Sequence, residues 1–149
     1  MQGSVTVHME APPEKVWALI SDVTQIGRFS PETLEAEWLD GATGPAVGVK
    51  FRGHVKRNQR GPMYWTTCKI TECEENRVFE FAVVMRDNAV NTWRYDLEPS
   101  GSGTDVTESF RLDNNLFSKI YWMLLGWARG KTNREDMRTT LERIKKEVE

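Results

Sequence analysis

The spacing of apolar residues changes its period once along this chain of 149 residues, and this change limits what the chain can fold into. Between residues 34 and 112 the spacing is close to two, which is typical of half-buried strands. From Leu116 to the end it becomes helical. Consecutive strands of this kind pair antiparallel, and a long amphipathic helix must bury its apolar stripe against them. The six predicted strands cover residues 34–38, 49–56, 63–73, 77–85, 89–98 and 104–112.

A seventh strand is predicted at the start of the chain, where residues 4–10 alternate apolar and polar side chains. Pro12 and Pro13 then open a short helix that ends near Asp22, and a helical turn follows. The sequence thus predicts an α+β fold. A curved seven-stranded antiparallel sheet wraps around the long C-terminal helix, and two short helices follow the first strand. Residues 1–149 show no linker or repeat, so we expect one domain.

Composition excludes several classes of protein. The 20 basic and 22 acidic residues give a net charge of −2, so binding to nucleic acid is not expected. Two His and two Cys are too few for a four-ligand zinc site, and no metal or cofactor is predicted. The longest apolar stretch, residues 116–128, is shorter than the roughly 20 residues that span a bilayer. Without a secretory signal, we expect a cytoplasmic protein with reduced thiols.

Several short motifs, taken in order, carry a family resemblance. They lie at residues 11–17, 29–31, 47–53, 64–68, 79–81, 93–99 and 103–109, followed by the final helix. In this series the chain resembles the START-like helix-grip superfamily (SRPBCC), in particular its bacterial polyketide cyclase/dehydrase and lipid transport branch. The resemblance implies an apolar cavity between sheet and helix that holds lipids, sterols or polyketides. Some members also catalyse cyclisation or aromatisation there. No fixed catalytic signature carries over, so ligand binding and catalysis both stay open.

The inward faces of the predicted strands supply the candidate ligand-binding residues. Most of them are aromatic, and polar or thiol side chains share their parity. The alternative is that these side chains simply fill a core. The candidates on the strands and in the loop after the short helices are Phe29, Phe51, Tyr64, Thr66, Cys68, Phe79, Phe81, Asn91, Trp93, Tyr95 and Phe110. The candidates on the helix are Phe117, Ile120, Tyr121 and Leu124.

Glu108 is the candidate catalytic residue. It lies between Val106 and Phe110 on an apolar face, and burial of a carboxyl group raises its pKa. The side chain could act as a general acid or base, or accept a hydrogen bond from a ligand hydroxyl. The alternative is a structural ion pair with an Arg or Lys nearby.

Other conspicuous residues receive a simpler interpretation. His8 and His54 fall on the polar parity of their strands, so both are expected to be exposed. Residues 126–132 resemble a phosphate-binding loop, but the spacing is one residue short and the segment lies in a predicted helix. The basic strand and turn of residues 50–60 is either a solvated face or a docking patch for an anionic membrane or acidic partner.

Three functions follow as hypotheses. The leading one is a protein that binds a hydrophobic small molecule, with access near Phe29 and residues 41–48. The second is an enzyme of the polyketide cyclase, aromatase or dehydratase kind acting in the same cavity. The third is an interaction or regulatory module without a ligand. The sequence places neither Trp122 nor Trp127, and it leaves the oligomeric state undetermined.

Overall fold

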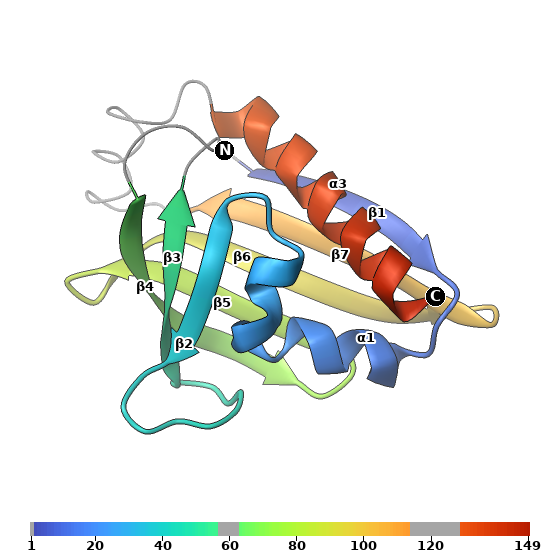
Figure 1. The fold of residues 1–149 in the computed structure, drawn as a ribbon, viewed down its shortest axis with the longest axis horizontal. Coiled ribbons are helices and arrows are strands. Elements are labelled where there is room, and N and C mark those ends of the chain that lie inside the picture. Colours follow the sequence, from blue (N-terminus) through green and yellow to red (C-terminus); the bar gives the residue numbers. More distant parts are fainter. Residues whose placement is uncertain (1, 57–62, 114–128) are drawn as a thin grey trace.

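Ten helices and strands make up the described part of the chain (Figure 1). The computed structural model describes residues 2–56, 63–113 and 129–149, with the backbone alone for residues 129–132. The strands are β1 (Gln2–Met9), β2 (Thr33–Trp38), β3 (Lys50–Lys56), β4 (Met63–Glu74), β5 (Val78–Met85), β6 (Asn88–Ser100) and β7 (Gly103–Leu112). The helices are α1 (Pro13–Ile20), the 3-10 helix η1 (Val23–Arg28) and α3 (Arg129–Val148).

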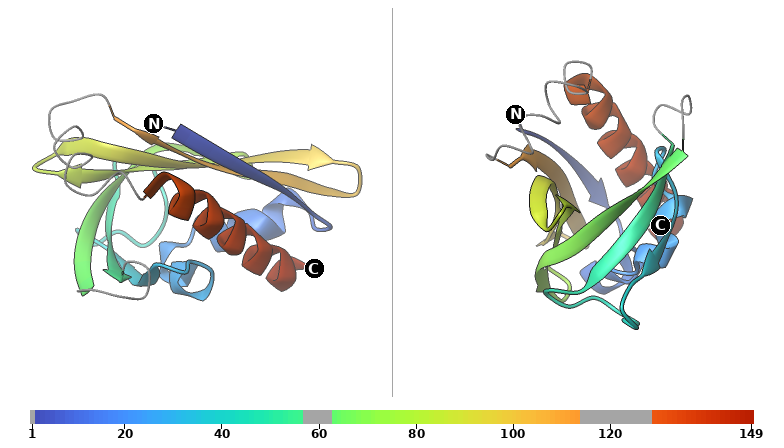
Figure 2. Two further views of the ribbon diagram at one scale, coloured as in Figure 1. Left: turned by 90° about the horizontal axis from the view of Figure 1, so that it is seen from above. Right: turned by 90° about the vertical axis from the view of Figure 1, so that its left-hand side faces the viewer.

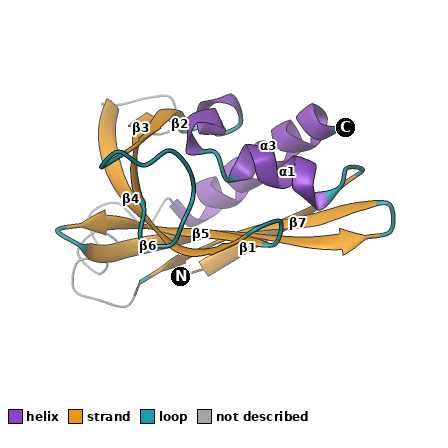
Figure 3. Ribbon diagram, turned by 90° about the horizontal axis from the view of Figure 1, so that it is seen from below, coloured by secondary structure: helices purple, strands orange, loops and turns teal. Residues whose placement is uncertain are grey.

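The strands form one antiparallel sheet in the order β1-β7-β6-β5-β4-β3-β2. Each strand from β2 to β7 lies beside its neighbour in sequence, while β1 crosses to pair with β7. The helices all lie on one side of the sheet, and β2, β3 and β4 turn up toward that side (Figure 3). The predicted helix-grip architecture, a curved sheet around a long helix with short helices after the first strand, is therefore confirmed.

Register shifts interrupt three of the strand pairs and help the sheet to curve. The shift between Thr33 and Glu35 leaves Leu34 without a partner on β3. Sequence parity places Leu34 and Ala36 on the same buried face, but Leu34 is 49% exposed while Ala36 is buried. The prediction for Leu34 is wrong because one inserted residue reverses the parity of a strand.

The two short helices connect β1 to β2 across the open side of the curved sheet. Pro13 begins α1, which buries Val16, Trp17 and Ile20 against the core. The Asp22 side chain then caps η1 by accepting a hydrogen bond from the Thr24 backbone N–H. These two helices bring the following residues 30–33 to the inner face of the sheet.

Helix α3 lies across the inner face, with its axis oblique to β1 (Figure 2). Its buried stripe is Met137, Leu141, Ile144 and Val148, the apolar stripe that helical spacing predicts. Near its C-terminal end α3 is joined to η1 by an ion pair between Glu147 and Arg28. Residues 114–128, and with them the candidates Phe117, Ile120, Tyr121 and Leu124 as well as Trp122 and Trp127, lie outside the described residues.

No helix in the described ranges combines the length and the apolar character that crossing a membrane requires.

Candidate functional site

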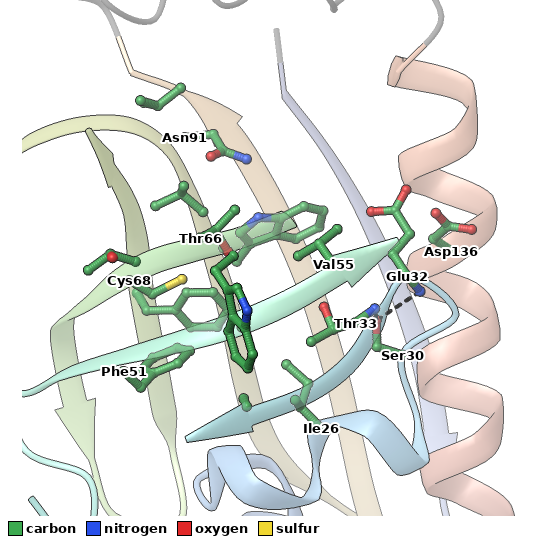
Figure 4. A pocket seen from close by; sticks show the side chains of 18 of the residues that line it. Ile26, Ser30, Glu32, Thr33, Phe51, Val55, Thr66, Cys68, Asn91 and Asp136 are labelled. Atoms are coloured by element: carbon green, nitrogen blue, oxygen red, sulfur yellow. Dashed lines mark hydrogen bonds between the residues drawn. The ribbon is translucent and has the colours of Figure 1, made fainter. Parts of the chain in front are cut away.

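A cavity of about 450 Å³ lies between the inner face of the sheet and α3 (Figure 4). This volume falls within the range of about 300 to 1,000 Å³ that is common for small-molecule sites. Strands β3 to β7 supply its floor, the segment from η1 into β2 one wall, and α3 another. The lining residues are Ile26, Ser30, Pro31, Glu32, Thr33, Ala36, Phe51, Gly53, Val55, Tyr64, Trp65, Thr66, Thr67, Cys68, Phe81, Val83, Val84, Met85, Val90, Asn91, Trp93, Tyr95, Glu108, Asp136, Met137 and Thr140.

Strand register explains why the floor is aromatic and mostly apolar. Phe81 and Trp93 lie directly opposite each other on β5 and β6, and Trp93 in turn lies opposite Phe110 on β7. Phe51 packs edge-on against Phe81 with ring centroids 5.1 Å apart. Of these rings, Phe51, Phe81 and Trp93 form an aromatic floor beneath the space that the curved sheet encloses with α3.

The rim of the cavity carries exposed apolar side chains from two strands. Tyr64 and Trp65 at the start of β4 are 36% and 42% exposed, and Met85 at the end of β5 is 50% exposed. Residues 41–48 are not among the described lining residues, and access beside that loop stays a prediction. The end of that loop instead hydrogen-bonds to β4, where the Gly48 backbone N–H donates to the carbonyl oxygen of the fully buried Ile70.

Glu108 lies in the cavity wall beside Tyr95, directly opposite on β6. The Tyr95 hydroxyl donates a 2.9 Å hydrogen bond to Glu108 Oε1, and both residues are more than nine-tenths buried. Glu108 Oε2 is also buried and has no hydrogen-bond partner among the described residues. The side chain forms no ion pair with any described Lys or Arg, so the structural alternative of such a pair finds no support in this part of the chain.

Burial sets the protonation of this pair. Removal from water raises the pKa of Glu108 to about 8, with a smaller contribution from the charge of Asp136, against the opposing effect of the Tyr95 hydrogen bond. Burial and the nearby Glu108 raise the pKa of Tyr95 as well. Glu108 therefore changes charge near neutral pH, in contact with the space where a ligand would lie.

Two further carboxyl side chains line the cavity from the side opposite the floor. Glu32 precedes β2 and Asp136 lies on α3, and both point to the α3 side of the cavity (Figure 4). The turn that holds Glu32 is fixed by Ser30, whose Oγ accepts hydrogen bonds from the backbone N–H groups of Glu32 and Thr33. Among the described lining residues there are three acids and no Lys, Arg or His.

Cys68 faces the same space from β4. Burial raises the pKa of its thiol to about 12, so it remains neutral and is a poor nucleophile at neutral pH. Asn91 and Thr66 are further polar side chains on the floor (Figure 4).

Nine predicted site residues lie in the lining of this one cavity. They are Phe51, Tyr64, Thr66, Cys68, Phe81, Asn91, Trp93, Tyr95 and Glu108. Phe29 and Phe79 instead border a void of about 20 Å³ beside it, which Tyr95 also borders. Phe110 is buried and packs against Trp93 at a centroid distance of 5.5 Å without lining the cavity.

The parity argument does not identify the lining residues that come from outside the strands. Glu32 lies three residues after Phe29, and Asp136 and Thr140 flank Met137 and Leu141 on the helix. The helical spacing could have pointed to Thr140, which lies one turn from Met137 and Ile144. Nothing in the pattern signals Glu32, because it lies in a turn without periodicity.

The histidines and the basic side chains of β3 do not line the cavity. His8 is exposed, as predicted, and hydrogen-bonds to Asp105 and Glu10. The prediction that His54 is exposed is wrong: its side chain is only 23% exposed, because its ring stacks on Trp65 at a centroid distance of 4.4 Å. On the outer face of β3, Arg52 pairs with Glu37 and Lys50 with Asp87. These ion pairs favour the interpretation of a solvated face. Residues 57–60 of the basic turn lie outside the described residues. No cluster of three potential metal ligands occurs in the described residues.

The curved sheet, the long helix and the cavity between them define a helix-grip protein. The family is shown by the sequence: the profile described as "Polyketide cyclase / dehydrase and lipid transport" matches residues 2–149, and the chain belongs to this family. Comparison with curated proteins gives no significant match.

Solved structures show the same fold. The KanY protein superposes with a TM-score of 0.72 at 17% identity, covering 99% of this chain and 97% of its own. A protein from Thermus thermophilus has a TM-score of 0.70 at 15% identity, with coverages of 99% and 97%. A Polyketide_cyc-like protein from Corynebacterium glutamicum is 28% identical with a TM-score of 0.56, over 99% of this chain and 84% of its own.

Proposed function

We propose that this protein binds a hydrophobic small molecule, such as a lipid or polyketide, in the cavity between the sheet and α3. The observation that carries the proposal is the 450 Å³ cavity itself, lined by aromatic and aliphatic side chains with a few polar groups. A module acting only through its surface would need no such space, and interior space without contacts costs packing energy. The family description, which includes lipid transport, supports the same function.

The proposal includes a cytoplasmic location and no nucleic-acid partner. Cys68 and Cys73 are both free thiols, which suits a reducing compartment. The net charge of −2 does not favour binding to phosphate backbones.

Ligand extraction and titration test the proposal. Native mass spectrometry of protein made in cells would show a copurified ligand, and tryptophan fluorescence would follow added lipids and aromatic polyketides because Trp93 lines the cavity. The variant Thr66→Phe would fill part of the cavity and is expected to weaken binding at least tenfold. Lys69→Phe, an exposed position on the same strand, is the matched control. If no apolar ligand binds, or if both variants bind equally well, the proposal is wrong.

A second candidate is an enzyme that moves a proton on an enolisable ligand. It is favoured by one observation, a carboxyl group in the cavity with a pKa of about 8 beside a tyrosine hydroxyl. Glu108→Gln would abolish turnover of a polyketide substrate while leaving the fold intact. Turnover that survives in this variant would remove Glu108 from the mechanism.

A further inference from the structure

The charged groups of the cavity lining indicate which charge a ligand in it would carry. Free fatty acids and phospholipid headgroups are anionic, and sites for anions ordinarily offer Arg, Lys or backbone N–H donors. The described lining residues include no Lys, Arg or His, whereas Glu32, Glu108 and Asp136 are acids. An anionic group drawn into this cavity would lose water and meet carboxyl groups, which is unfavourable on both counts.

Glu108 offers one definite point of attachment. Its Oε1 already accepts the Tyr95 hydrogen bond, while Oε2 is buried without a partner in the described structure. An unmade hydrogen bond of a buried carboxyl oxygen costs free energy, which a ligand donor at that position would recover.

Among the described residues, the titratable groups that act on Glu108 come from two elements. Tyr95 on β6 donates to it, and Asp136 on α3 adds negative charge nearby. A cation at Oε2 would interact favourably with both carboxyl groups. The rings of Phe81 and Trp93, which line the same space, suit an apolar body and attract a cation through their faces.

We propose, on the basis of the proposed function, that the cavity selects an apolar ligand carrying a protonated amine, which donates a hydrogen bond to Glu108 Oε2. Glu108 is the binding residue for the amine, and Tyr95 is a positioning residue that fixes the orientation of the carboxyl group. The free protein holds Glu108 protonated at pH 7, so binding transfers that proton to solvent as the ammonium–carboxylate pair forms.

Three ligands of equal chain length provide the test: decylamine, 1-decanol and decanoic acid, titrated by calorimetry below their micelle concentrations. At pH 8.5 we expect decylamine to bind at least about tenfold more tightly than decanol, with decanoate weakest, since a close charge pair of this kind is commonly worth more than a factor of ten. Tight binding of decanoate, or a decanol affinity equal to that of decylamine, would overturn the proposal.

The dependence on pH gives a second readout. An alkylamine resembles lysine in its pKa of about 10.4 and stays charged up to about pH 9.5. Decylamine affinity should therefore rise between pH 6 and 8, by up to about tenfold per unit, as Glu108 ionises. At pH 7 its binding should release close to one proton, measured in two buffers of different ionisation enthalpy, whereas decanol should release none. An affinity for decylamine that falls as pH rises would contradict the proposed pair.

Variants separate this inference from the proposed function. Glu108→Gln retains an acceptor for the Tyr95 hydroxyl and should lose the preference for decylamine and the proton release, while still binding decanol. Glu98→Gln makes the same change at an exposed position of β6 and should behave as the wild type. A preference that persists in Glu108→Gln refutes the role of Glu108. If none of the three ligands binds the wild type, the proposed function fails as well.

Discussion

At the scale of single residues, burial keeps Glu108 protonated at pH values where an exposed glutamate would be ionised. Its strand neighbours Val106 and Phe110 are buried core residues, and Glu108 is 5% exposed among them. A chain that kept this position only for packing would gain stability from an apolar residue of similar size. Glu108 therefore lowers the stability of the fold, as residues of binding and catalytic sites commonly do.

The contribution of Glu108 to the free energy of unfolding depends on pH. The pKa of Glu108 is about 8 in the fold, against 4.5 for an ordinary glutamate, so the folded state binds more protons between these values. The stabilisation linked to the bound proton is complete below pH 4.5 and is lost as pH rises toward 8, at no more than about 1.4 kcal/mol per unit. We expect the stability difference between Glu108→Gln and the wild type to grow over this range. Urea denaturation at several pH values measures it, and parallel pH profiles would contradict the assignment.

The hydrogen bond from Tyr95 can be tested separately. Tyr95→Phe removes the donor and leaves both Glu108 oxygens without a partner among the described residues, which should destabilise the protein by about 1–3 kcal/mol. A double-mutant cycle with Glu108→Met, which removes both carboxyl oxygens, isolates the pair from the loss of the hydroxyl itself. Additive effects of the two substitutions would show that the bond contributes nothing.

At the scale of elements, the outer face of the sheet is held together by charges across four strands. Arg94 on β6 contacts Glu72 on β4, Glu80 on β5 and Asp96 on its own strand, and Arg111 on β7 also contacts Glu80. Although burial raises the pKa of Glu80, hydrogen bonds from Thr71 and Arg94 hold it below its usual value. The network keeps the buried charge of Glu80 paired.

Arg94→Met should therefore be more damaging than an ordinary surface change. It removes the nearer of the two Arg partners of Glu80 and should lower the free energy of unfolding by about 1–3 kcal/mol. Arg77→Met is the matched control, because the Arg77–Glu74 pair is exposed and worth less than about 1 kcal/mol. Equal effects of the two substitutions would show that the network is no stronger than a surface ion pair.

The order and type of the elements were predictable from the sequence, but the shape of the cavity was not. Strand parity correctly predicts an inward orientation for Asn91, Trp93, Tyr95 and Glu108, because a strand has only two faces. It cannot separate Phe79 from Phe81: both point inward, yet only Phe81 lines the cavity. That difference depends on where the helices cover the sheet. Glu32 and Asp136 were missed for the same reason, since the segments opposite the floor are placed by tertiary packing.

At the scale of the whole molecule, filling the cavity should stabilise the fold. A ligand at about 100 times its dissociation constant adds about 2.7 kcal/mol to the free energy of unfolding. For a chain of this length that corresponds to a rise in Tm of about 5–10 °C. Differential scanning calorimetry with increasing ligand measures the shift, and Thr66→Phe should show much less of it. A Tm that does not depend on ligand concentration would place binding outside the cavity.

The pairing of β1 with β7 has a consequence for how the chain is made. Gln2 lies opposite Arg111 and Met9 opposite Thr104, so the first strand of the sheet to leave the ribosome pairs with the last one to follow it. At a synthesis rate of about 5–20 residues per second, β7 is made roughly 5–20 seconds after β1. Strands β2 to β6 can pair with sequence neighbours during that time, since a hairpin closes within microseconds. Packing of the sheet around α3 is therefore completed only after β7 and α3 have been made, and until then β1 is a strand without its pairing partner.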